Sequence, residues 1–380
     1  MISRLFRTQK NNSFFLFGPR GTGKSFFLKH SFPQSFYINL LEDETYQLLL
    51  ANPSRLKDMI PYLFQNSKKW IVIDEIQKIP ALLDEVHWLI EEKKIKFILT
   101  GSSARKLRRG GANLLAGRAY TQHAFPLTAL ELGNRFNLKK ALKCGLLPKA
   151  YLEENSKNYL TSYVTTYLKE EVQQEGLVRN IGMFARFMES ASFSQGQVLN
   201  FSNVAQDSHI ERKTVTNYFM LLEDLLLAHF LDVFTLRSKR QLIQHRKFYF
   251  FDVGVFLQIR PLGPLDSEDE LMDIGLETLV FQELIARNEY QDWGYRIYFW
   301  HTQDHLEVDF ILYGKRGFKA IEVKKSARLS SADFTGLLEF KKDYPQAELY
   351  LVYGGSEVKH LYGVAIIPAQ LFFLDTQKWI

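Results

Sequence analysis

Cysteine, long apolar runs and low-complexity tracts are scarce or absent in this chain of 380 residues. Cys144 is the single cysteine, which excludes an intramolecular disulfide and a metal site built from several cysteines. No apolar run approaches the roughly 20 residues that a membrane-spanning helix needs. Residues 1–6 are too broken in pattern for a signal peptide. These absences predict a cytoplasmic protein without membrane contact.

What is present is the composition of a globular protein with a modest excess of positive charge. Hydrophobic residues make up 46% and charged residues 24% of the chain, so we expect packed cores. At this length the chain has room for two or three domains. The net charge of +6 is compatible with nucleic-acid binding but does not by itself identify DNA as a partner.

A glycine-rich segment directly after an apolar run is the most specific motif in the sequence. It has the form G-x-x-x-x-G-K-S and consists of Gly18, Pro19, Arg20, Gly21, Thr22, Gly23, Lys24 and Ser25. Between a strand and a helix, such glycines let backbone amides converge on phosphate oxygens at the positive end of the helix. We predict that Lys24 contacts the β- and γ-phosphates of ATP and that the Ser25 hydroxyl binds Mg²⁺.

A second apolar run, residues 70–73, ends in Asp74 and Glu75. Alone this pattern is usually structural, but together with the glycine-rich segment it predicts an ATPase site. Asp74 would hold the Mg²⁺ shell and Glu75 would polarise the attacking water. A third apolar run, residues 97–100, precedes Ser102. Two interpretations of Ser102 remain open: it senses the γ-phosphate, or it caps the next helix.

Strand-like and helix-like segments alternate over residues 1–145, which predicts a parallel sheet covered by helices. The expected strands are residues 14–17, 36–40, 70–73, 97–100 and 120–125. Residues 104–118 interrupt the pattern with a basic cluster that contains Arg105, Lys106, Arg108 and Arg109. Arg118 follows this cluster. It is either an arginine finger, acting in cis or on a neighbouring subunit of a homo-oligomer, or part of a solvated charge run.

Residues 146–264 are expected to form a helical and winged-helix section. After helix-like segments at 158–175 and 181–192, a short helix, a turn at 207–209 and a longer helix follow, with an outer face formed by Arg212, Lys213, Thr214 and Asn217. Strand-like runs at 230–234 and 247–251 then flank a stretch that contains Arg237, Lys239, Arg240, His245 and Arg246. This pattern predicts a winged helix with a basic wing, and both DNA contact and protein contact remain open.

The last third, residues 265–380, contains a second group of residues that suggests chemistry. An acidic linker is expected at 266–273, followed by a helix with Glu277. Strands then carry Asp309, Glu322 and Lys324, and the two-residue period places Glu322 and Lys324 on one face. Two carboxylates on neighbouring strands can share Mg²⁺ or Mn²⁺, which activates a bound water beside the lysine. The pattern predicts a deoxyribonuclease site, or a relic of the same fold that no longer cuts.

Residues 14–25, 71–78 and 99–103, with 115–118 and 125–127, resemble AAA-type bacterial and archaeal ATPases of the additional-strand P-loop class. In many of these a winged helix follows, and a PD-(D/E)xK nuclease-like domain ends the chain. That layout is matched by residues 163–171, 247–254, 275–284 and 307–324. The resemblance implies roles in ATP chemistry for Lys24, Ser25, Asp74 and Glu75. It implies a nuclease site made of Asp309, Glu322, Lys324 and a helix acid, either Glu277 or Glu283.

The expected fold class is therefore α/β. A P-loop parallel sheet occupies residues 1–145, a helical and winged-helix section 146–264, and a restriction-endonuclease-like α/β domain 265–380. The leading functional hypothesis is an ATP-dependent protein that binds and cuts DNA. The alternative is an ATP-driven switch that binds DNA or a protein partner and does not cut.

Overall fold

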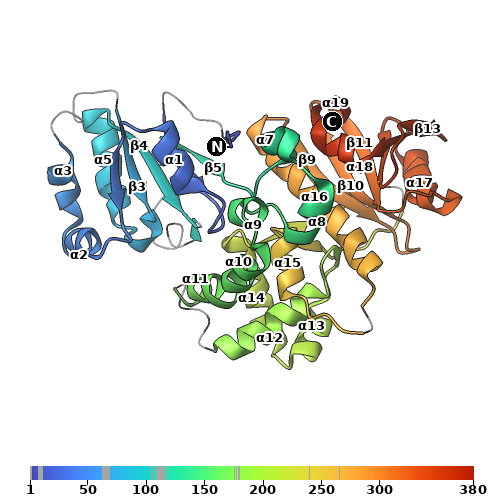
Figure 1. The fold of residues 1–380 in the computed structure, drawn as a ribbon, viewed down its shortest axis with the longest axis horizontal. Helices are drawn as coiled ribbons and strands as arrows, with labels where there is room; N and C mark the ends of the chain where they lie inside the picture. Colours follow the sequence, from blue (N-terminus) through green and yellow to red (C-terminus); the bar gives the residue numbers. More distant parts are fainter. Residues whose placement is uncertain are drawn as a thin grey trace. The chain divides into compact units, whose positions relative to one another are not determined.

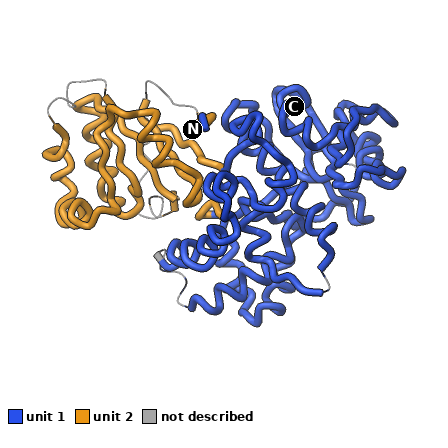
Figure 2. The backbone as a smooth tube through the Cα atoms, viewed as in Figure 1, with its two compact units in different colours: residues 1–3, 126–223, 228–380 blue, residues 4–125, 224–227 orange. Residues whose placement is uncertain are grey.

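The structure, a computed structural model, describes residues 2–6, 12–61, 69–102, 104, 105, 107, 115, 118–174, 176, 178, 180–238, 240–264 and 266–380. It divides into two compact units (Figure 2). The N-terminal unit contains residues 4–125 and 224–227, and the C-terminal unit contains residues 1–3, 126–223 and 228–380. No helix in the described part is long and apolar enough to cross a membrane. Of the basic residues expected in charged loops, those outside the described residues are Lys106, Arg108, Arg109 and Lys239.

A five-stranded parallel sheet forms the centre of the N-terminal unit (Figure 1). Its strand order is β2-β3-β4-β1-β5, and every neighbouring pair is parallel. The strands are β1 (Ser13–Phe17), β2 (Phe36–Asn39), β3 (Trp70–Asp74), β4 (Lys96–Gly101) and β5 (Ala119–His123). Strand β4 lies between the strand that precedes the glycine-rich loop and the strand that ends in Asp74. This order confirms the predicted parallel sheet with its additional strand.

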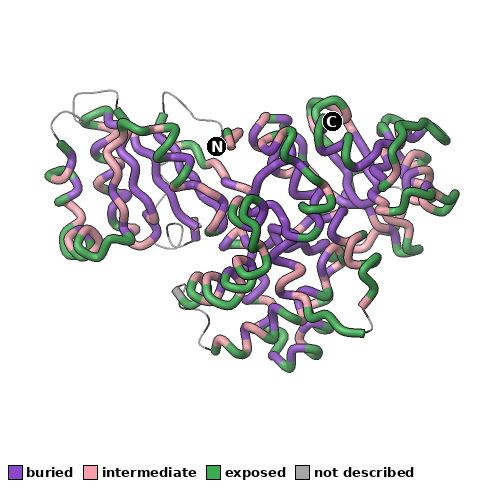
Figure 3. Tube along the Cα trace, viewed as in Figure 1, coloured by how far each residue is buried: buried purple, intermediate pink, exposed green. Residues whose placement is uncertain are grey.

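The strands of this sheet could be predicted from the sequence because helices cover them and their residues are buried. The main helices of the unit are α1 (Lys24–Ser31), α2 (Asp43–Ala51), α3 (Leu56–Met59) and α5 (Leu82–Lys93). All five residues of β1 are buried, as are most residues of β3 and β4 (Figure 3). Parallel strands that are covered on both faces appear in a sequence as continuous apolar runs.

The C-terminal unit begins with short helices: α7 (Ala129–Leu132), α8 (Leu138–Cys144), α9 (Pro148–Leu152), α10 (Ser156–Ser162) and α11 (Leu168–Gln174). The helix predicted over residues 158–175 is present, but a π-helical turn at Tyr163–Tyr167 separates α10 from α11. In such a turn the hydrogen bonds run from residue i to i+5, and the chain stays helical. The prediction of one continuous helix therefore did not anticipate the interruption.

A buried aspartate joins this helical region to helix α15 (Val253–Ile259). The carboxylate of Asp252 accepts hydrogen bonds from the backbone amide of Val255 at 3.1 Å, which caps α15, and from that of Leu146 at 2.8 Å. The two segments pass so closely that a Cβ on Gly145 would overlap Asp252. The Phe-Asp-Val-Gly part of the resemblance therefore has a structural explanation, a helix cap that also binds a second segment.

The middle of the C-terminal unit has the order helix, strand, two helices and two strands. The elements are α12 (Ile181–Ser192), β6 (Gln197–Val198), α13 (Phe201–Ser208), α14 (Arg212–Asp224), β7 (Ala228–Leu231) and β8 (Lys247–Phe250). The strands form an antiparallel sheet in the order β6-β8-β7. Phe219 of α14 packs on Phe187 of α12 and on Phe248 of β8, with ring centroids 4.8 and 5.1 Å apart.

A six-stranded mixed sheet forms the last part of the unit (Figure 1). Its order is β13-β14-β12-β11-β10-β9, with β9, β10 and β11 antiparallel and β11, β12 and β14 parallel. The strands are β9 (Tyr295–His301), β10 (Glu307–Gly314), β11 (Gly317–Lys324), β12 (Glu348–Tyr353), β13 (Lys359–Leu361) and β14 (Val364–Pro368). The register of β10 against β9 shifts between Val308 and Ile311, a stretch that contains Asp309. Such irregularities re-aim side chains.

The acidic linker predicted over residues 266–273 is wrong, because most of it is the first part of helix α16 (Glu268–Tyr290). The Ser267 hydroxyl accepts a hydrogen bond from the amide of Glu270 at 3.4 Å and caps the helix. The acidic side chains occupy the first turn, where the helix dipole favours negative charge. The other helices of this region are α17 (Thr335–Asp343), α18 (Ala369–Leu374) and α19 (Thr376–Trp379).

The connection between β7 and β8 lies along β9, the edge strand of the six-stranded sheet. The amide of Phe234 donates to the carbonyl of Phe299 at 2.7 Å, and the amide of Ile243 donates to that of His301 at 3.2 Å. The ring of Phe234 is buried in the core of this sheet. The segment that we predicted to be a basic wing is therefore anchored to the C-terminal sheet.

Two arginines of this predicted wing are neutralised within the unit. Their side chains form ion pairs over 2.7 to 3.0 Å with the following acids: Glu339 and Asp343 for Arg240, and Glu223 and Asp232 for Arg246. Contact of these two side chains with DNA phosphates, which stays a prediction, would require them to exchange these partners.

Candidate functional site

The glycine-rich loop follows the carboxyl end of β1 and leads directly into α1. Gly21 and Gly23 have φ angles of 85° and 89°, which glycine adopts without steric cost. A Cβ on Gly18 would overlap the carbonyl of Ala124, which follows β5. The residue that caps α1 is Gly23, so no side chain competes for the first amides of the helix. This loop has the shape and polarity that a phosphate group needs.

Lys24, Ser25 and Asp74 meet at this loop, as the sequence predicted for an ATP site. Lys24 is buried, and its ammonium donates to the carbonyls of Gly18 at 2.6 Å and Pro19 at 3.1 Å. The Ser25 hydroxyl donates to the Asp74 carboxylate at 2.8 Å. These oxygen groups fit Mg²⁺, because both lie at one point and are the ligand type that it prefers. The ion would neutralise phosphate charge when bound with ATP.

Tyr37 and Thr100 also donate hydrogen bonds to Asp74, from strands β2 and β4 on either side of β3. Burial and the neighbouring Asp74 carboxylate raise the pKa of the Tyr37 hydroxyl, so it stays protonated and continues to donate. The two side chains hold Asp74 in one orientation. Sequence reasoning missed both, although each lies in or beside a predicted strand.

Glu75, Gln77 and Ser102 form a second contact set at the same edge of the sheet. Glu75 has a left-handed backbone with φ of 64°, a conformation that costs energy in a non-glycine residue and concentrates at functional sites. The Gln77 amide donates to Glu75 at 2.5 Å and to Ser102 at 3.1 Å, and it packs on Gly101. Gln77 therefore links the acid predicted to activate water to the residue predicted to sense the γ-phosphate. Its position in the Asp-Glu-Ile-Gln run was the available signal.

Arg4 is a further residue that the sequence did not single out. Its guanidinium donates to the carbonyl of Thr22 in the loop at 2.5 Å and to that of Phe125 at 2.8 Å. Because the two carbonyls belong to distant segments, this side chain fixes the loop against the end of β5.

Arg118 lies at the opposite end of the sheet from the glycine-rich loop. Strands β1 and β5 are parallel with Ser13 opposite Ala119, so Arg118 is beside the start of β1 and the loop follows its end. Along five residues of strand this is a separation of about 16 Å. Arg118 forms an ion pair with Glu91 of α5, which lowers the pKa of that carboxyl. In this structure Arg118 therefore does not reach the site of its own chain, and a role on a neighbouring subunit stays a prediction.

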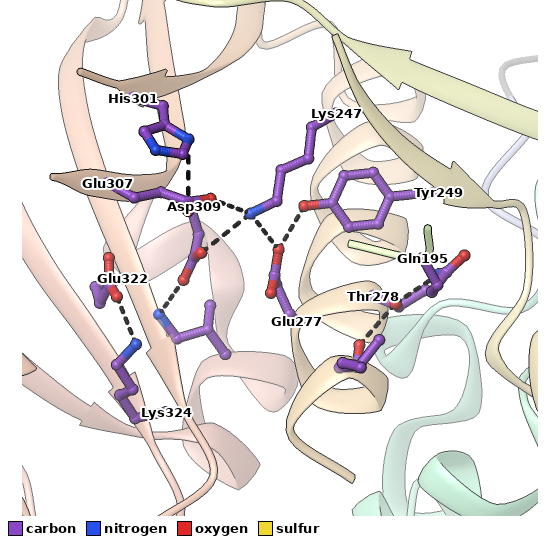
Figure 4. Close-up of polar contacts among 12 residues, drawn as sticks. Gln195, Lys247, Tyr249, Glu277, Thr278, His301, Glu307, Asp309, Glu322 and Lys324 are labelled. Atoms are coloured by element: carbon purple, nitrogen blue, oxygen red, sulfur yellow. Dashed lines mark hydrogen bonds and ion pairs between the residues drawn. The ribbon is translucent and has the colours of Figure 1, made fainter. Parts of the chain in front are cut away.

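A second polar cluster lies in the C-terminal unit, around Lys247 of β8 (Figure 4). Its ammonium is 2.8 Å from Glu277 of α16, and 2.6 and 3.3 Å from Glu307 and Asp309 of β10. The Tyr249 hydroxyl donates to Glu277 at 2.5 Å. Sequence reasoning missed Lys247, Tyr249 and Glu307 as members of this site.

Glu322 and Lys324 lie beside this cluster and pair with each other. Their side chains are 2.7 Å apart, which agrees with their predicted position on one face of β11. Asp309 accepts a hydrogen bond from the amide of Val323 at 2.9 Å. One carboxylate oxygen of Glu322 is buried and has no hydrogen-bond partner among the described residues. The two acids predicted to share a metal are thus divided between two lysines.

The predicted Mg²⁺ or Mn²⁺ site does not fit this arrangement. With the Lys247 ammonium between these carboxylates, no three His, Cys, Asp or Glu side chains among the residues that the structure describes are placed to hold a metal ion. The ammonium of Lys247 stands where their carboxylates converge. Of the two candidate helix acids, Glu277 faces the cluster. Glu283 instead pairs with Arg287 at 3.3 Å and accepts from the amide of Ala129 at 2.9 Å.

Burial controls the charges of this cluster. It raises the pKa of Glu277 to about 7 and, with help from the charge of Asp309, raises the pKa of Glu322 to about 8. Burial alone lowers the pKa of Lys247, but the surrounding carboxylates, Glu277 above all, raise it well above its ordinary value. Lys247 therefore stays charged at neutral pH.

Comparison with known families identifies the N-terminal unit. Residues 10–133 match the family described as AAA domain, and the loop, the parallel sheet and Asp74 have the arrangement that ATP binding requires. Residues 10–133 are an AAA-type P-loop ATPase domain. Residues 135–266 and 275–372 match two families described as domains of unknown function, DUF8612 and DUF4143. Neither description names a DNA-binding or nuclease activity.

Individual relatives are distant. An uncharacterized protein of Haemophilus influenzae is 23% identical over 297 residues, which are 73% of this chain and 71% of that protein. The Orc1 protein of Aeropyrum pernix, solved in complex with DNA, is 13% identical over 65% of this chain and 86% of its own, with a TM-score of 0.28. A signal transduction ATPase with a tetratricopeptide repeat sensor from Pyrococcus horikoshii is 14% identical. The match covers 77% of this chain and 48% of that chain, with a TM-score of 0.21. These TM-scores do not establish a shared fold across the chain.

Two substitutions in the ATPase domain separate nucleotide binding from hydrolysis. Lys24→Ala removes the charge expected to meet the β- and γ-phosphates, so ATP affinity should fall about ten- to hundredfold. Glu75→Gln should keep ATP affinity and slow hydrolysis about a hundredfold or more, because only the water-activating group is lost. Titration with a fluorescent ATP analogue and phosphate release measure the two effects. Lys57→Ala, at an exposed position, is the control. Wild-type hydrolysis by Glu75→Gln would exclude Glu75 as the catalytic residue.

The raised pKa of Glu322 predicts how stability depends on pH. Its folded pKa of about 8 exceeds the ordinary value of 4.5, so the unfolded chain loses this proton first. The stability from the protonated group is complete below about pH 4.5 and falls as pH rises toward 8. Glu322→Gln lacks this loss and should gain stability relative to wild type by up to ~1 kcal/mol per pH unit over that window. Urea unfolding followed by tryptophan fluorescence measures it, with Glu154→Gln as control. A difference that is constant with pH would contradict the prediction.

Proposed function

We propose that this protein is an ATP-driven switch that binds DNA, and that its C-terminal nuclease-like domain does not cut. The observation that carries the switch is the convergence of Lys24, Ser25 and Asp74 at the loop of an AAA-type domain. ATP would replace the loop carbonyls as the partner of Lys24. Its γ-phosphate would reach the Ser102–Gln77–Glu75 contact set.

The proposed DNA contact is helix α14. The element order α12, β6, α13, α14, β7 and β8, with strand order β6-β8-β7, supports α14 as the recognition helix of a winged helix. Its Arg212, Lys213 and Asn217 are exposed. The helix face supports the proposal better than the wing does, because Arg240 and Arg246 of the connecting segment are already paired with acids. A protein partner for the same face is the alternative outcome of the test.

The non-cutting part of the proposal is supported by Lys247. A metal-dependent nuclease needs a divalent cation between its carboxylates. Here an ammonium contacts three of them. The Asp309, Glu322 and Lys324 set that resembles a nuclease would then serve to hold the fold or a DNA strand.

DNA binding through α14 should be sensitive to salt. Replacing Arg212 and Lys213 together by Ala should lower affinity about tenfold or more and reduce the log–log salt slope by about 2, since each phosphate contact contributes ~0.9. Fluorescence anisotropy with labelled duplex measures this, in Glu75→Gln with ATP and without nucleotide. The switch predicts different affinities for the two states. The matched control is Lys139→Ala with Lys143→Ala on α8. An unchanged slope and affinity would favour a protein partner.

Wild-type protein should leave DNA intact. Circular, linear and branched substrates are incubated with Mg²⁺ or Mn²⁺, with and without ATP, and separated on gels. Asp309→Ala is the control for any contaminating nuclease. Cutting that is lost in Asp309→Ala would overturn the non-cutting proposal and restore the leading hypothesis from the sequence.

A further inference from the structure

The acidic cluster of the C-terminal unit is arranged around one nitrogen atom. The ammonium of Lys247 lies between 2.6 and 3.3 Å from carboxylate oxygens of Glu277, Glu307 and Asp309. Figure 4 shows the three side chains directed at this nitrogen from two different elements. Oxygen anions that converge on a point are the surroundings of a hard cation, and here the cation belongs to the chain itself.

The ammonium is fully enclosed and fully paired. The Lys247 side chain is 2% exposed, and a buried ammonium is costly unless it is paired and hydrogen-bonded. The ammonium has three N–H donors, and three carboxylates lie within hydrogen-bonding or ion-pair distance of it. A metal ion that entered this position would have to expel a satisfied charge. The arrangement therefore disfavours a bound metal more strongly than an empty acidic pocket would.

Neighbouring groups hold the carboxylates in place for the ammonium. The Tyr249 hydroxyl donates to Glu277 at 2.5 Å, and the amide of Val323 donates to Asp309 at 2.9 Å. Glu322, which was expected to share a metal with Asp309, pairs with Lys324. Each of these acids therefore has at least one partner in the same chain, and one buried oxygen of Glu322 has none among the described residues.

We propose that Lys247 occupies the cation position of this nuclease-like site, so that the site is complete without a divalent metal. Lys247 comes from β8, whereas its partners come from α16 and β10. The same contact therefore joins the three-stranded sheet to the six-stranded sheet. This inference rests on the proposed non-cutting function and gives it a physical cause.

The test is Mn²⁺ binding to the full-length, nucleotide-free protein, measured by water-proton relaxation after removal of metals. The wild-type protein and the Asp309→Asn variant should bind the same number of Mn²⁺ ions. Lys247→Met has a side chain of similar length without charge. It should gain one site with a dissociation constant of about 10⁻⁴–10⁻³ M, the range of weak oxygen sites. Adding Asp309→Asn should abolish that site. Lys247→Arg keeps the charge and should gain none.

A wild-type Mn²⁺ site that is lost in Asp309→Asn would overturn the proposal. So would a Lys247→Met variant that is folded by circular dichroism and binds no Mn²⁺. A variant that folds only when Mn²⁺ is added would support it. If Lys247→Met folds neither with nor without Mn²⁺, the difference in Mn²⁺ binding between wild type and Asp309→Asn tests the proposal. Wild-type DNA cutting without an Asp309-dependent Mn²⁺ site would overturn the proposed function and leave this inference standing.

Discussion

The burial of one positive charge, that of Lys247, is the constraint on which the C-terminal unit depends. An ammonium with 2% exposure requires anionic partners, and those partners belong to α16 and β10. Strand β8 must therefore lie against both elements. The connecting segment before β8 lies along β9 and inserts Phe234 into the core of the same sheet. Because truncating one partner of a buried charge group costs several kcal/mol, this polar contact and the apolar contact of Phe234 act together to fix the two sheets.

The parts of the fold that follow from local sequence were predictable. Strands β1, β3 and β4 are covered on both faces, so each is a continuous apolar run, and the glycine-rich loop is defined by residues within one segment. The pairing of Glu322 with Lys324 follows from the two-residue period of a strand. Each of these inferences needs only neighbours in the sequence. The glycine-rich loop, Asp74 and Ser102 were found for the same reason, whereas Tyr37, Thr100, Gln77 and Arg4, which contact these groups or the loop, were missed.

The parts that depend on distant pairing were not predictable. Lys247 is 62 residues from Asp309, and its strand belongs to another sheet, so no pattern in the sequence marks it as a member of the cluster. Arg118 was placed by motif, but the parallel register of β1 and β5 puts it at the far end of the sheet. The acidic stretch at the start of α16 was interpreted as a linker from its charge, although carboxylates are favoured in a first helical turn. The position of Lys247 depends on a side-chain pairing, that of Arg118 on strand register, and the structure of the acidic stretch on the helix dipole.

The two buried lysines differ in the charge of the groups that they contact. Lys24 donates to two neutral backbone carbonyls, and phosphate oxygens, which carry charge, form stronger hydrogen bonds to an ammonium. ATP can therefore take over this lysine from the two carbonyls. Lys247 contacts three carboxylates, and any ligand that displaced it would separate the ammonium from all three. The proposed nucleotide-dependent change therefore involves the neutral partners of Lys24, whereas the charged cluster around Lys247 resists rearrangement.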